Sequence, residues 1–182
     1  MRKVLILTGD GGEALEVMYP YQRLLEAGFS VDIAAPSKKM IQTVVHDFEA
    51  GFDTYTEKRG YRVQATLAFH GVRPADYVGL VIPGGRAPEY IRNDEHCRRI
   101  VQHFFQIKKP VAAICHAALI LIPLKVLKGK KVAAYPALRP DMEEAGATFM
   151  DQEVVVDGQL VTSRAWPDHP AFMREFLKLL SE

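Results

Sequence analysis

Short apolar runs alternate with amphipathic segments along the chain, and this alternation restricts the possible folds most. Segments 13–27 and 94–107 have apolar residues at helical spacing, and Gly28 marks the end of the first. Strands joined by helical crossovers predict a mostly parallel central sheet with helices on both faces, a three-layer α/β sandwich. Four short runs can be buried on both faces, as central parallel strands require: residues 3–8, 30–35, 77–82 and 111–114.

The second half of the chain is less regular. We expect a helix from Cys115 to Leu127, bent at Pro123. Segment 40–69 is long for a connection, which predicts either a small accessory hairpin or a functional loop. Further elements are expected as a strand at 131–134, a helix near 140–145, a hairpin at 153–162 turning at Asp157-Gly158, and a closing helix at 168–180.

Length and composition exclude several classes of protein. The 182 residues predict a single domain spanning 1–182. With 23 basic and 22 acidic residues, the net charge of +1 argues against nucleic-acid binding through phosphate contacts. The longest apolar stretch, residues 111–124, is interrupted by Cys, His and Pro, so we expect no membrane span. The apolar run at 4–7 is too short for a signal peptide and is followed by glycines, so we expect none. Two cysteines cannot form a disulfide framework, which favours a cytoplasmic location.

Cys115 stands where a buried apolar strand ends and the next helix is expected to begin. In a parallel sheet, the loops 9–16, 83–89 and 115–117 converge beyond the carboxyl ends of the strands. A cysteine at such a turn forms a nucleophile elbow, with room provided by Ala113 and Ala117. The following helix N-terminus is expected to lower the pKa of the thiol and to offer backbone N–H groups to an oxyanion. The alternative is a buried, inert cysteine, the structural role that we assign to Cys97.

The first loop resembles a dinucleotide-binding fingerprint only formally. Residues 9–14 read Gly-Asp-Gly-Gly-Glu-Ala, but Glu13 and Glu16 would repel a pyrophosphate, so we expect no cofactor. The two glutamates have two possible roles. They either stabilise the helix N-terminus, or one faces the cleft beside Cys115, where it hydrogen-bonds to the sulfur and moves protons.

Several histidines are candidates for other roles. His96, Cys97 and His103 share one helical segment, but the two histidines lie two turns apart beside arginines, and we expect no metal site. His46 and Asp47 either reach over the cleft or form a polar turn.

The motifs together resemble the ThiJ/PfpI superfamily over nearly the whole chain. The string Gly84-Gly85-Arg86-Ala87-Pro88-Glu89 is typical of the branch that holds PfpI-type peptidases and plant-type glyoxalase III proteins. The segments 45–49 (Val-His-Asp-Phe-Glu) and 165–170 (Ala-Trp-Pro-Asp-His-Pro) look closer to the plant glyoxalases. The resemblance implies a flavodoxin-like sandwich.

The resemblance also implies roles for individual residues. Cys115 matches the family nucleophile, Glu16 the carboxyl that hydrogen-bonds to it, and His116 the adjacent histidine. Gly85 and His116 match the positions whose backbone N–H groups form an oxyanion hole. Glu89 matches a glutamate that reaches a histidine of a neighbouring subunit, which implies a homodimer or higher homo-oligomer. The family usually has Gly after Cys-His, where this chain has Ala117.

Two further residues have open roles. Arg86 is either a substrate clamp or part of a solvent or interface salt bridge. His169 faces the pocket if the resemblance holds there, and otherwise lies beside the cap of the last helix.

Three functions are compatible with these residues. The first is a cofactor-free glyoxalase III-like enzyme that converts methylglyoxal or glyoxal, small reactive carbonyl compounds, to a 2-hydroxy acid, with deglycation as the same chemistry. The second is a PfpI-type cysteine peptidase or amidase that uses Cys115, His116 and Glu89 of a second subunit. The third is a redox-sensing chaperone without turnover, because an exposed thiolate oxidises readily.

Overall fold

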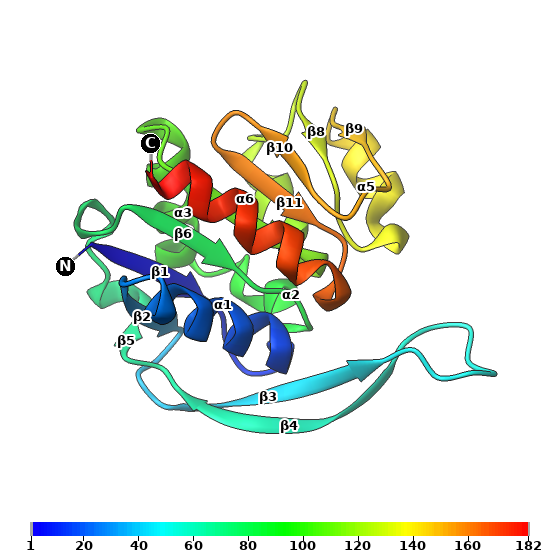
Figure 1. Ribbon diagram of the computed structural model, residues 1–182, viewed down its shortest axis with the longest axis horizontal. Helices are drawn as coiled ribbons and strands as arrows, with labels where there is room; N and C mark the ends of the chain where they lie inside the picture. The colour runs from blue at the N-terminus through cyan, green and yellow to red at the C-terminus, as the bar shows by residue number, and fades with distance from the viewer. Residues whose placement is uncertain (1, 182) are drawn as a thin grey trace.

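The centre of the structure, a computed structural model that describes residues 2–181, is a seven-stranded sheet (Figure 1). Neighbouring strands are parallel, except that β10 and β11 are antiparallel. The predicted mostly parallel α/β sheet is confirmed. From one edge to the other the strands are β10 (Val155–Asp157), β11 (Leu160–Ser163), β7 (Val111–Ile114), β6 (Gly79–Ile82), β1 (Lys3–Leu7), β2 (Ser30–Ala35) and β5 (Leu67–Ala68).

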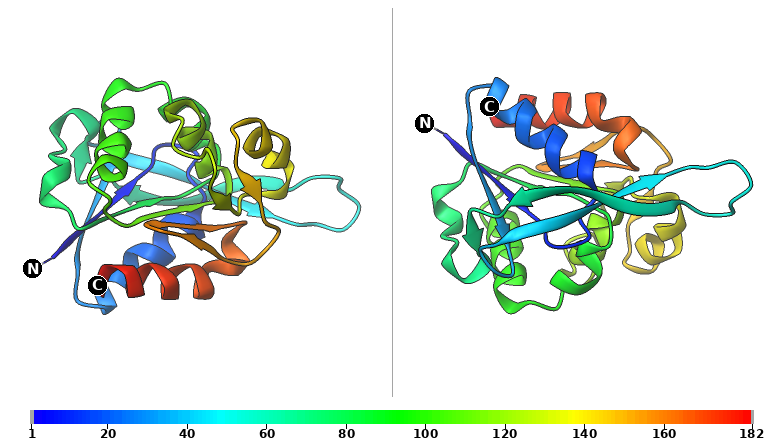
Figure 2. Two further views of the ribbon diagram at one scale, coloured as in Figure 1. Left: turned by 90° about the horizontal axis from the view of Figure 1, so that it is seen from above. Right: turned by 90° about the horizontal axis from the view of Figure 1, so that it is seen from below.

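Helices cover both faces of this sheet (Figure 2). On one face lie α1 (Ala14–Glu26) and α6 (His169–Ser181), and on the other α2 (Ala87–Ile91), α3 (Glu95–Gln106) and α4 (Ala118–Leu121). Side chains of β1 alternate between the two layers: Val4 and Ile6 belong to one core cluster, Leu5 and Leu7 to the other. Because successive side chains point to opposite faces and helices cover both faces, the central strands are apolar throughout.

The segment after β7 differs from the single bent helix that the sequence predicts. A 3₁₀ turn at Cys115–Ala117 leads into the four-residue α4, and a second 3₁₀ turn follows at Ile122–Leu124. Pro123 lies in the first positions of that second turn. Because proline has no N–H to donate, it cannot continue the helical hydrogen bonds, and the chain turns there.

Segment 40–69 contains the accessory hairpin, the first of its two predicted alternatives. Strands β3 (Met40–Asp47) and β4 (Thr56–Gln64) form a separate two-stranded antiparallel sheet that extends as a long arm (Figure 1). The arm is tied to the first loop, because Gly11 N donates to Gln42 O over 2.9 Å and Val44 N to Gly12 O over 2.9 Å.

A small outlying unit completes the fold. It consists of α5 (Arg139–Glu144) and the parallel pair β8 (Lys131–Val132) and β9 (Thr148–Phe149). Within residues 2–181, no helix combines the length and the apolar character needed to cross a bilayer.

Candidate active site

Cys115 adopts a left-handed backbone conformation directly after β7. Its φ is +61°, a region that non-glycine residues rarely occupy, and the residue is only 5% exposed. Tyr135 N donates to Cys115 O over 3.2 Å and helps to hold the turn. A strained conformation held by its surroundings is typical of functional positions. This geometry is that of the predicted nucleophile elbow.

Glu16 is the acidic residue that faces Cys115. It is fully buried on α1, and its Oε2 accepts a 2.7 Å hydrogen bond from Gly84 N. Its other oxygen, Oε1, has no partner among the described residues. Burial and the neighbouring Glu13 raise the pKa of Glu16 to about 8, so its carboxyl group is mostly protonated at neutral pH. Glu16 Oε2 and Cys115 Cβ lie on either side of Gly84, each 2.6 Å from the position that a Cβ on that glycine would take, and each of the two residues affects the pKa of the other.

Glu13 has the other of the two roles that the sequence left open. It is the N-cap of α1, and its Oε2 accepts from Glu16 N over 2.7 Å. Glu13 is nevertheless fully buried beside the cavity, and its Oε1 lacks a partner within residues 2–181. The two glutamates therefore share this end of the helix, one as cap and one as neighbour of the thiol.

Two glycines allow the loops to approach the nucleophile. A Cβ on Gly84 would lie 2.6 Å from both Cys115 Cβ and Glu16 Oε2. Gly85 has φ +77°, and a Cβ there would lie 2.3 Å from Gly11 O. Only glycine allows such close backbone approach. Gly84 had no predicted role, although the Gly84-Gly85 pair was the available signal.

His116 lies against the sulfur. Its Nδ1 is 3.2 Å from Cys115 Sγ, and its ring stacks on Tyr135 with centroids 4.9 Å apart. Burial, together with the charge of His46, lowers the pKa of His116 to about 4. The imidazole is therefore neutral at physiological pH, and in the tautomer with Nδ1 unprotonated it can accept a proton from the thiol.

The expectation that the helix N-terminus gives Cys115 a lowered pKa is wrong. Burial and the adjacent Glu16 raise the pKa of the thiol well above its usual range. The backbone N–H groups of Gly85 and His116 lower the pKa of the thiol, as expected, but by less than burial raises it. One physical reason is that α4 has only four residues, so the dipole that follows the nucleophile is small.

These groups line a small cavity with a volume of about 10 Å³. That is close to the space that one water needs. The sequence indicated the two glutamates, the two histidines and Cys115, and Trp166 stands in the segment 165–170 that carries part of the resemblance. Tyr55 and Tyr135 were not predicted as site residues. The lining residues are Glu13, Glu16, His46, Phe48, Tyr55, Cys115, His116, Tyr135, Ala165 and Trp166.

Comparison with known proteins identifies the family. A model described as the DJ-1/PfpI family matches residues 2–179. The chain belongs to the DJ-1/PfpI family. The resemblance inferred from its motifs is therefore confirmed.

Relatives of this DJ-1/PfpI chain include named enzymes. It is 46% identical over 178 residues to a deglycase of Pyrococcus horikoshii, with 98% of this chain and 99% of that protein covered. It is 42% identical over 186 residues to protein DJ-1 homolog D of Arabidopsis thaliana, with 98% of this chain covered. The chain spans about half of that plant protein, 48% of its length.

A solved structure shows the same fold. It is a two-domain protein of Anabaena variabilis with DJ-1/ThiJ/PfpI-like and ferritin-like domains. The TM-score is 0.88 at 31% identity, with 100% of this chain and 48% of that chain covered.

His46 and Asp47 have different positions in this DJ-1/PfpI chain, although they are adjacent. His46 is 6% exposed and lines the cavity, whereas Asp47 is exposed and lies outside it. Successive strand residues point to opposite faces, so the two could not both reach the cleft. Arg86 lies at the edge of the site in an ion pair with Glu57, with Nε 2.9 Å from Oε1, which corresponds to the salt-bridge alternative.

Two other predicted residues lie outside the cavity lining. His169 is buried, but it stacks on Tyr19 with ring centroids 5.0 Å apart. His169 therefore does not face the pocket and lies instead at the start of α6, the other predicted position. Glu89 is exposed on α2. Its charge contributes to raising the pKa of Tyr55, which is raised chiefly by burial, so Glu89 lies on the same side of the molecule as the site.

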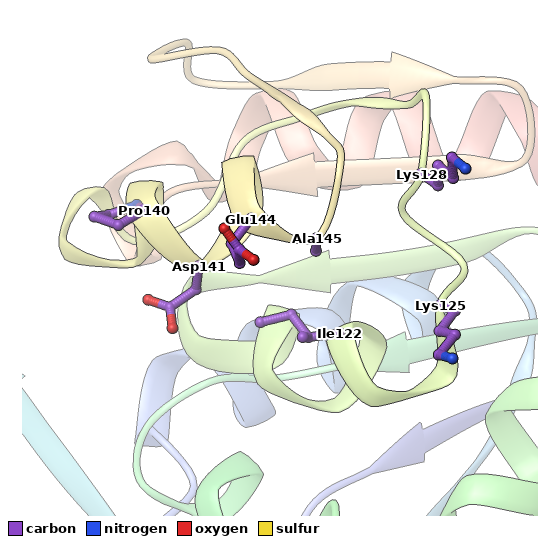
Figure 3. A pocket seen from close by; sticks show the side chains of 7 residues that line it. All are labelled: Ile122, Lys125, Lys128, Pro140, Asp141, Glu144 and Ala145. Atoms are coloured by element: carbon purple, nitrogen blue, oxygen red, sulfur yellow. The ribbon is translucent and has the colours of Figure 1, made fainter.

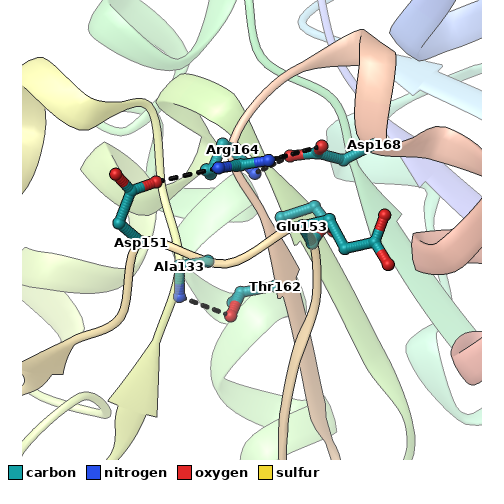
Figure 4. A network of polar contacts seen from close by, with 7 residues as sticks. Ala133, Asp151, Glu153, Thr162, Arg164 and Asp168 are labelled. Carbon is teal, nitrogen blue, oxygen red and sulfur yellow. Dashed lines mark hydrogen bonds and ion pairs between the residues drawn. The ribbon is translucent and has the colours of Figure 1, made fainter.

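A polar network fixes the loop that carries Trp166 over the cavity (Figure 4). Arg164 donates to both oxygens of Asp168, over 2.9 and 3.0 Å, and to Asp151 Oδ1 over 2.9 Å. Beside it, Thr162 Oγ1 accepts from Ala133 N over 2.9 Å. A two-pronged arginine–carboxylate pair restricts orientation as well as distance. The network therefore positions the wall of the site that Ala165 and Trp166 provide.

A more open hollow lies apart from this chemistry, between the turn at Ile122 and α5 (Figure 3). Two lysines and two carboxylates surround apolar groups there, and none of its lining residues is a cysteine or histidine. In the part of the chain that the structure describes, no group of three or more His, Cys, Asp or Glu side chains could hold a metal ion.

Proposed function

We propose that this protein is a cofactor-independent enzyme of the glyoxalase III type, which converts methylglyoxal or glyoxal to lactate or glycolate. The observation that carries the proposal is the buried placement of Cys115 beside Glu16 and His116 in a small cavity. A thiol with a proton acceptor on one side and a neutral carboxyl on the other suits addition to an aldehyde.

In the first step, Cys115 Sγ attacks the aldehyde carbon while the thiol proton passes to His116 Nδ1. The resulting alkoxide accepts hydrogen bonds from the backbone N–H groups of Gly85 and His116, and then takes the proton to form a hemithioacetal. Glu16 first loses its carboxyl proton to solvent, and its carboxylate then removes the hydrogen of this carbon and returns it to the neighbouring carbon through an enediol. A raised pKa makes the carboxylate a stronger base for this transfer. Water hydrolyses the thioester and regenerates the thiol.

The size of the cavity supports a small carbonyl substrate. With room for about one water molecule, the cavity cannot hold a polypeptide segment unless its walls move apart. A two- or three-carbon dicarbonyl requires the smallest rearrangement of Tyr55 and Trp166. The walls of the cavity would also exclude bulk water from such a substrate during the proton transfers.

The direct test is turnover of methylglyoxal without glutathione. Wild type and the control variant Cys97→Ala should consume it and form lactate, and Cys115→Ala should not. No turnover by the wild type, or equal turnover by Cys115→Ala, would exclude the proposal.

Deglycation is the second activity that we propose for the same site, since the archaeal relative is named a deglycase. In both reactions the sulfur of Cys115 becomes bonded to the aldehyde-derived carbon. With the free aldehyde it adds to the C=O bond and no group leaves. With the adduct, the bond from that carbon to the sulfur of N-acetylcysteine breaks, and N-acetylcysteine leaves as a thiol with the proton from Cys115. The adduct of methylglyoxal with N-acetylcysteine would be the substrate. Loss of the adduct faster than free methylglyoxal is consumed would show that the enzyme acts on the adduct itself.

The peptidase and chaperone alternatives are outcomes of further tests. A peptidase that uses Glu89 from a second subunit needs a homo-oligomer, so it predicts casein zymography activity that is lost in Glu89→Gln. A redox-sensing chaperone without turnover predicts oxidation of Cys115 and no lactate. All three functions need a free thiol, which supports a reducing, cytoplasmic location; neither Cys97 nor Cys115 is in a disulfide.

A further inference from the structure

The hairpin arm places one polar side chain, His46, in the cavity lining, and the catalytic steps proposed above do not use it. His46 on β3 lines the cavity, and its Nε2 lies 2.8 Å from Glu57 Oε2 on β4. The two residues are directly opposite one another in the hairpin register. Cross-strand neighbours of this kind are held at a fixed spacing by the backbone.

Glu57 is in turn fixed by Arg86. The arginine Nε lies 2.9 Å from each carboxylate oxygen of Glu57. Although partial burial acts to raise the pKa of Glu57, its hydrogen bonds to Arg86 and His46 and their charges lower it overall. Glu57 is therefore an ionised acceptor, and the imidazole N–H donates to it.

Arg86 connects these contacts to the loop after β6, which lies beside Cys115. Its backbone N donates to Gly11 O over 2.7 Å, and it directly follows Gly85, which faces the sulfur through its N–H group. The contacts therefore form one series. Arg86, in the loop after β6, contacts Glu57 on the arm, and Glu57 contacts His46, which lines the cavity. On the inner side, Tyr55 packs on His46 with ring centroids 4.4 Å apart.

We propose that His46 is a catalytic proton donor and acceptor for the substrate oxygens, with Glu57 and Arg86 as positioning residues. This inference rests on the proposed glyoxalase function. Because Glu57 occupies Nε2 of the imidazole, Nδ1 is the nitrogen left for the substrate. A carboxylate on one ring nitrogen that orients the other is a general arrangement for acid–base histidines.

The proton transfers then balance. As Glu16 removes the C1 hydrogen of the hemithioacetal, the C1–H electrons form the C1=C2 bond, and the C2 carbonyl oxygen takes a proton from His46. The enediol next loses its O1 proton to His46 as Glu16 returns a proton to C2. The C1–O1 double bond of the thioester forms, and both residues regain their starting states.

The test compares kcat and KM for methylglyoxal in the wild type and four hairpin variants. His46→Gln should lower kcat ~100-fold with KM changed less than threefold, because loss of one positioned acid–base group has effects of this size. Glu57→Gln should lower kcat ~10-fold, with partial recovery in Glu57→Asp. Glu49→Gln is the matched control, because Glu49 pairs with Lys58 on the same arm outside the cavity lining. It should equal the wild type.

A second measurement separates chemistry from damage to the fold. Alkylation of Cys115 by iodoacetamide should proceed within threefold of the wild-type rate in His46→Gln and Glu57→Gln. A kcat for His46→Gln within twofold of the wild type would overturn the inference. So would an equal loss in Glu49→Gln, or slower alkylation of Cys115. These outcomes would not contradict the proposed glyoxalase function, whereas an inactive wild type would overturn both that function and the role of His46.

Discussion

The two cysteines of this chain are both buried and both free, yet their surroundings differ completely. Cys97 is fully buried on α3 in the same apolar cluster as Ile100 and Phe104, and burial raises the pKa of its thiol to about 12. Cys115 is 5% exposed in a left-handed turn beside a carboxyl, an imidazole and a cavity.

Neither burial nor the direction of the pKa shift distinguishes Cys115, the thiol that we propose to be reactive, from Cys97 in the core. Both thiols have raised pKa values. The difference lies in what a departing proton and an arriving carbonyl would encounter. At Cys115 they find His116 Nδ1 at 3.2 Å and inward-facing N–H groups. At Cys97 they find aliphatic and aromatic carbon.

The largest expected effect is in thiol reactivity. At pH 8, iodoacetamide should modify Cys115 at least ~100-fold faster than Cys97, because Cys97 becomes accessible only when the core opens. Peptide mass spectrometry of samples taken at intervals measures both rates. Equal rates would remove the distinction between the two cysteines.

Glu16→Gln should sharpen the comparison by separating reactivity from turnover. Glu16 raises the pKa of the Cys115 thiol, so the variant should have a lower thiol pKa and should be alkylated faster at pH 7. Its turnover of methylglyoxal should still fall ~100-fold, because the proton carrier is lost. Cys97 should be unchanged. A variant with normal turnover would show that Glu16 is not the proton carrier.

Gly84→Ala should damage the Cys115 region alone. The new methyl group would lie 2.6 Å from Cys115 Cβ and Glu16 Oε2, so we expect a loss of about 1–3 kcal/mol in unfolding free energy and ~10-fold in turnover. Gly71→Ala is the matched control, since nothing lies within 4 Å of the position that its new methyl group would take. Urea denaturation with both variants checks this, and equal stability of the two would contradict it.

The smallest effect concerns stability between pH 6.5 and 8. The pKa of Glu16 is raised to about 8 from 4.5, so the folded state binds more protons than the unfolded state, and stability falls as pH rises. His116 and His169 have pKa values lowered from 6.5 to about 4, so they increase stability as pH rises from about 4 to about 7. The wild type and Glu16→Gln share this contribution, so it cancels in the difference between them. Over 6.5–8 the wild type should lose about 1–2 kcal/mol relative to Glu16→Gln.

Calorimetry at several pH values tests this difference. Parallel curves for the wild type and Glu16→Gln would mean that Glu16 is ionised in the folded state throughout. Cys97→Ala should follow the pH dependence of the wild type, because its thiol does not titrate in this window.

The sheet, most of its flanking elements and the position of Cys115 at the end of a strand could be predicted from the amino-acid sequence alone. The strands at 30–35 and 111–114 have the bounds that their apolar runs predict, and Glu13 and Asp94 cap the helices that were expected to begin there. These features depend on local periodicity and capping, which neighbouring residues fix. Cys115 was located in the same way, by the junction of one strand with one turn.

Only the tertiary structure decided which polar groups surround the sulfur. It placed His46 in the cavity and Asp47 outside, put Glu16 against the thiol, and left His169 against Tyr19. It also reversed the expected direction of the thiol pKa. The reason is that burial, hairpin docking and contacts between residues far apart in the chain depend on how separate elements pack, and no local pattern in the chain encodes that packing.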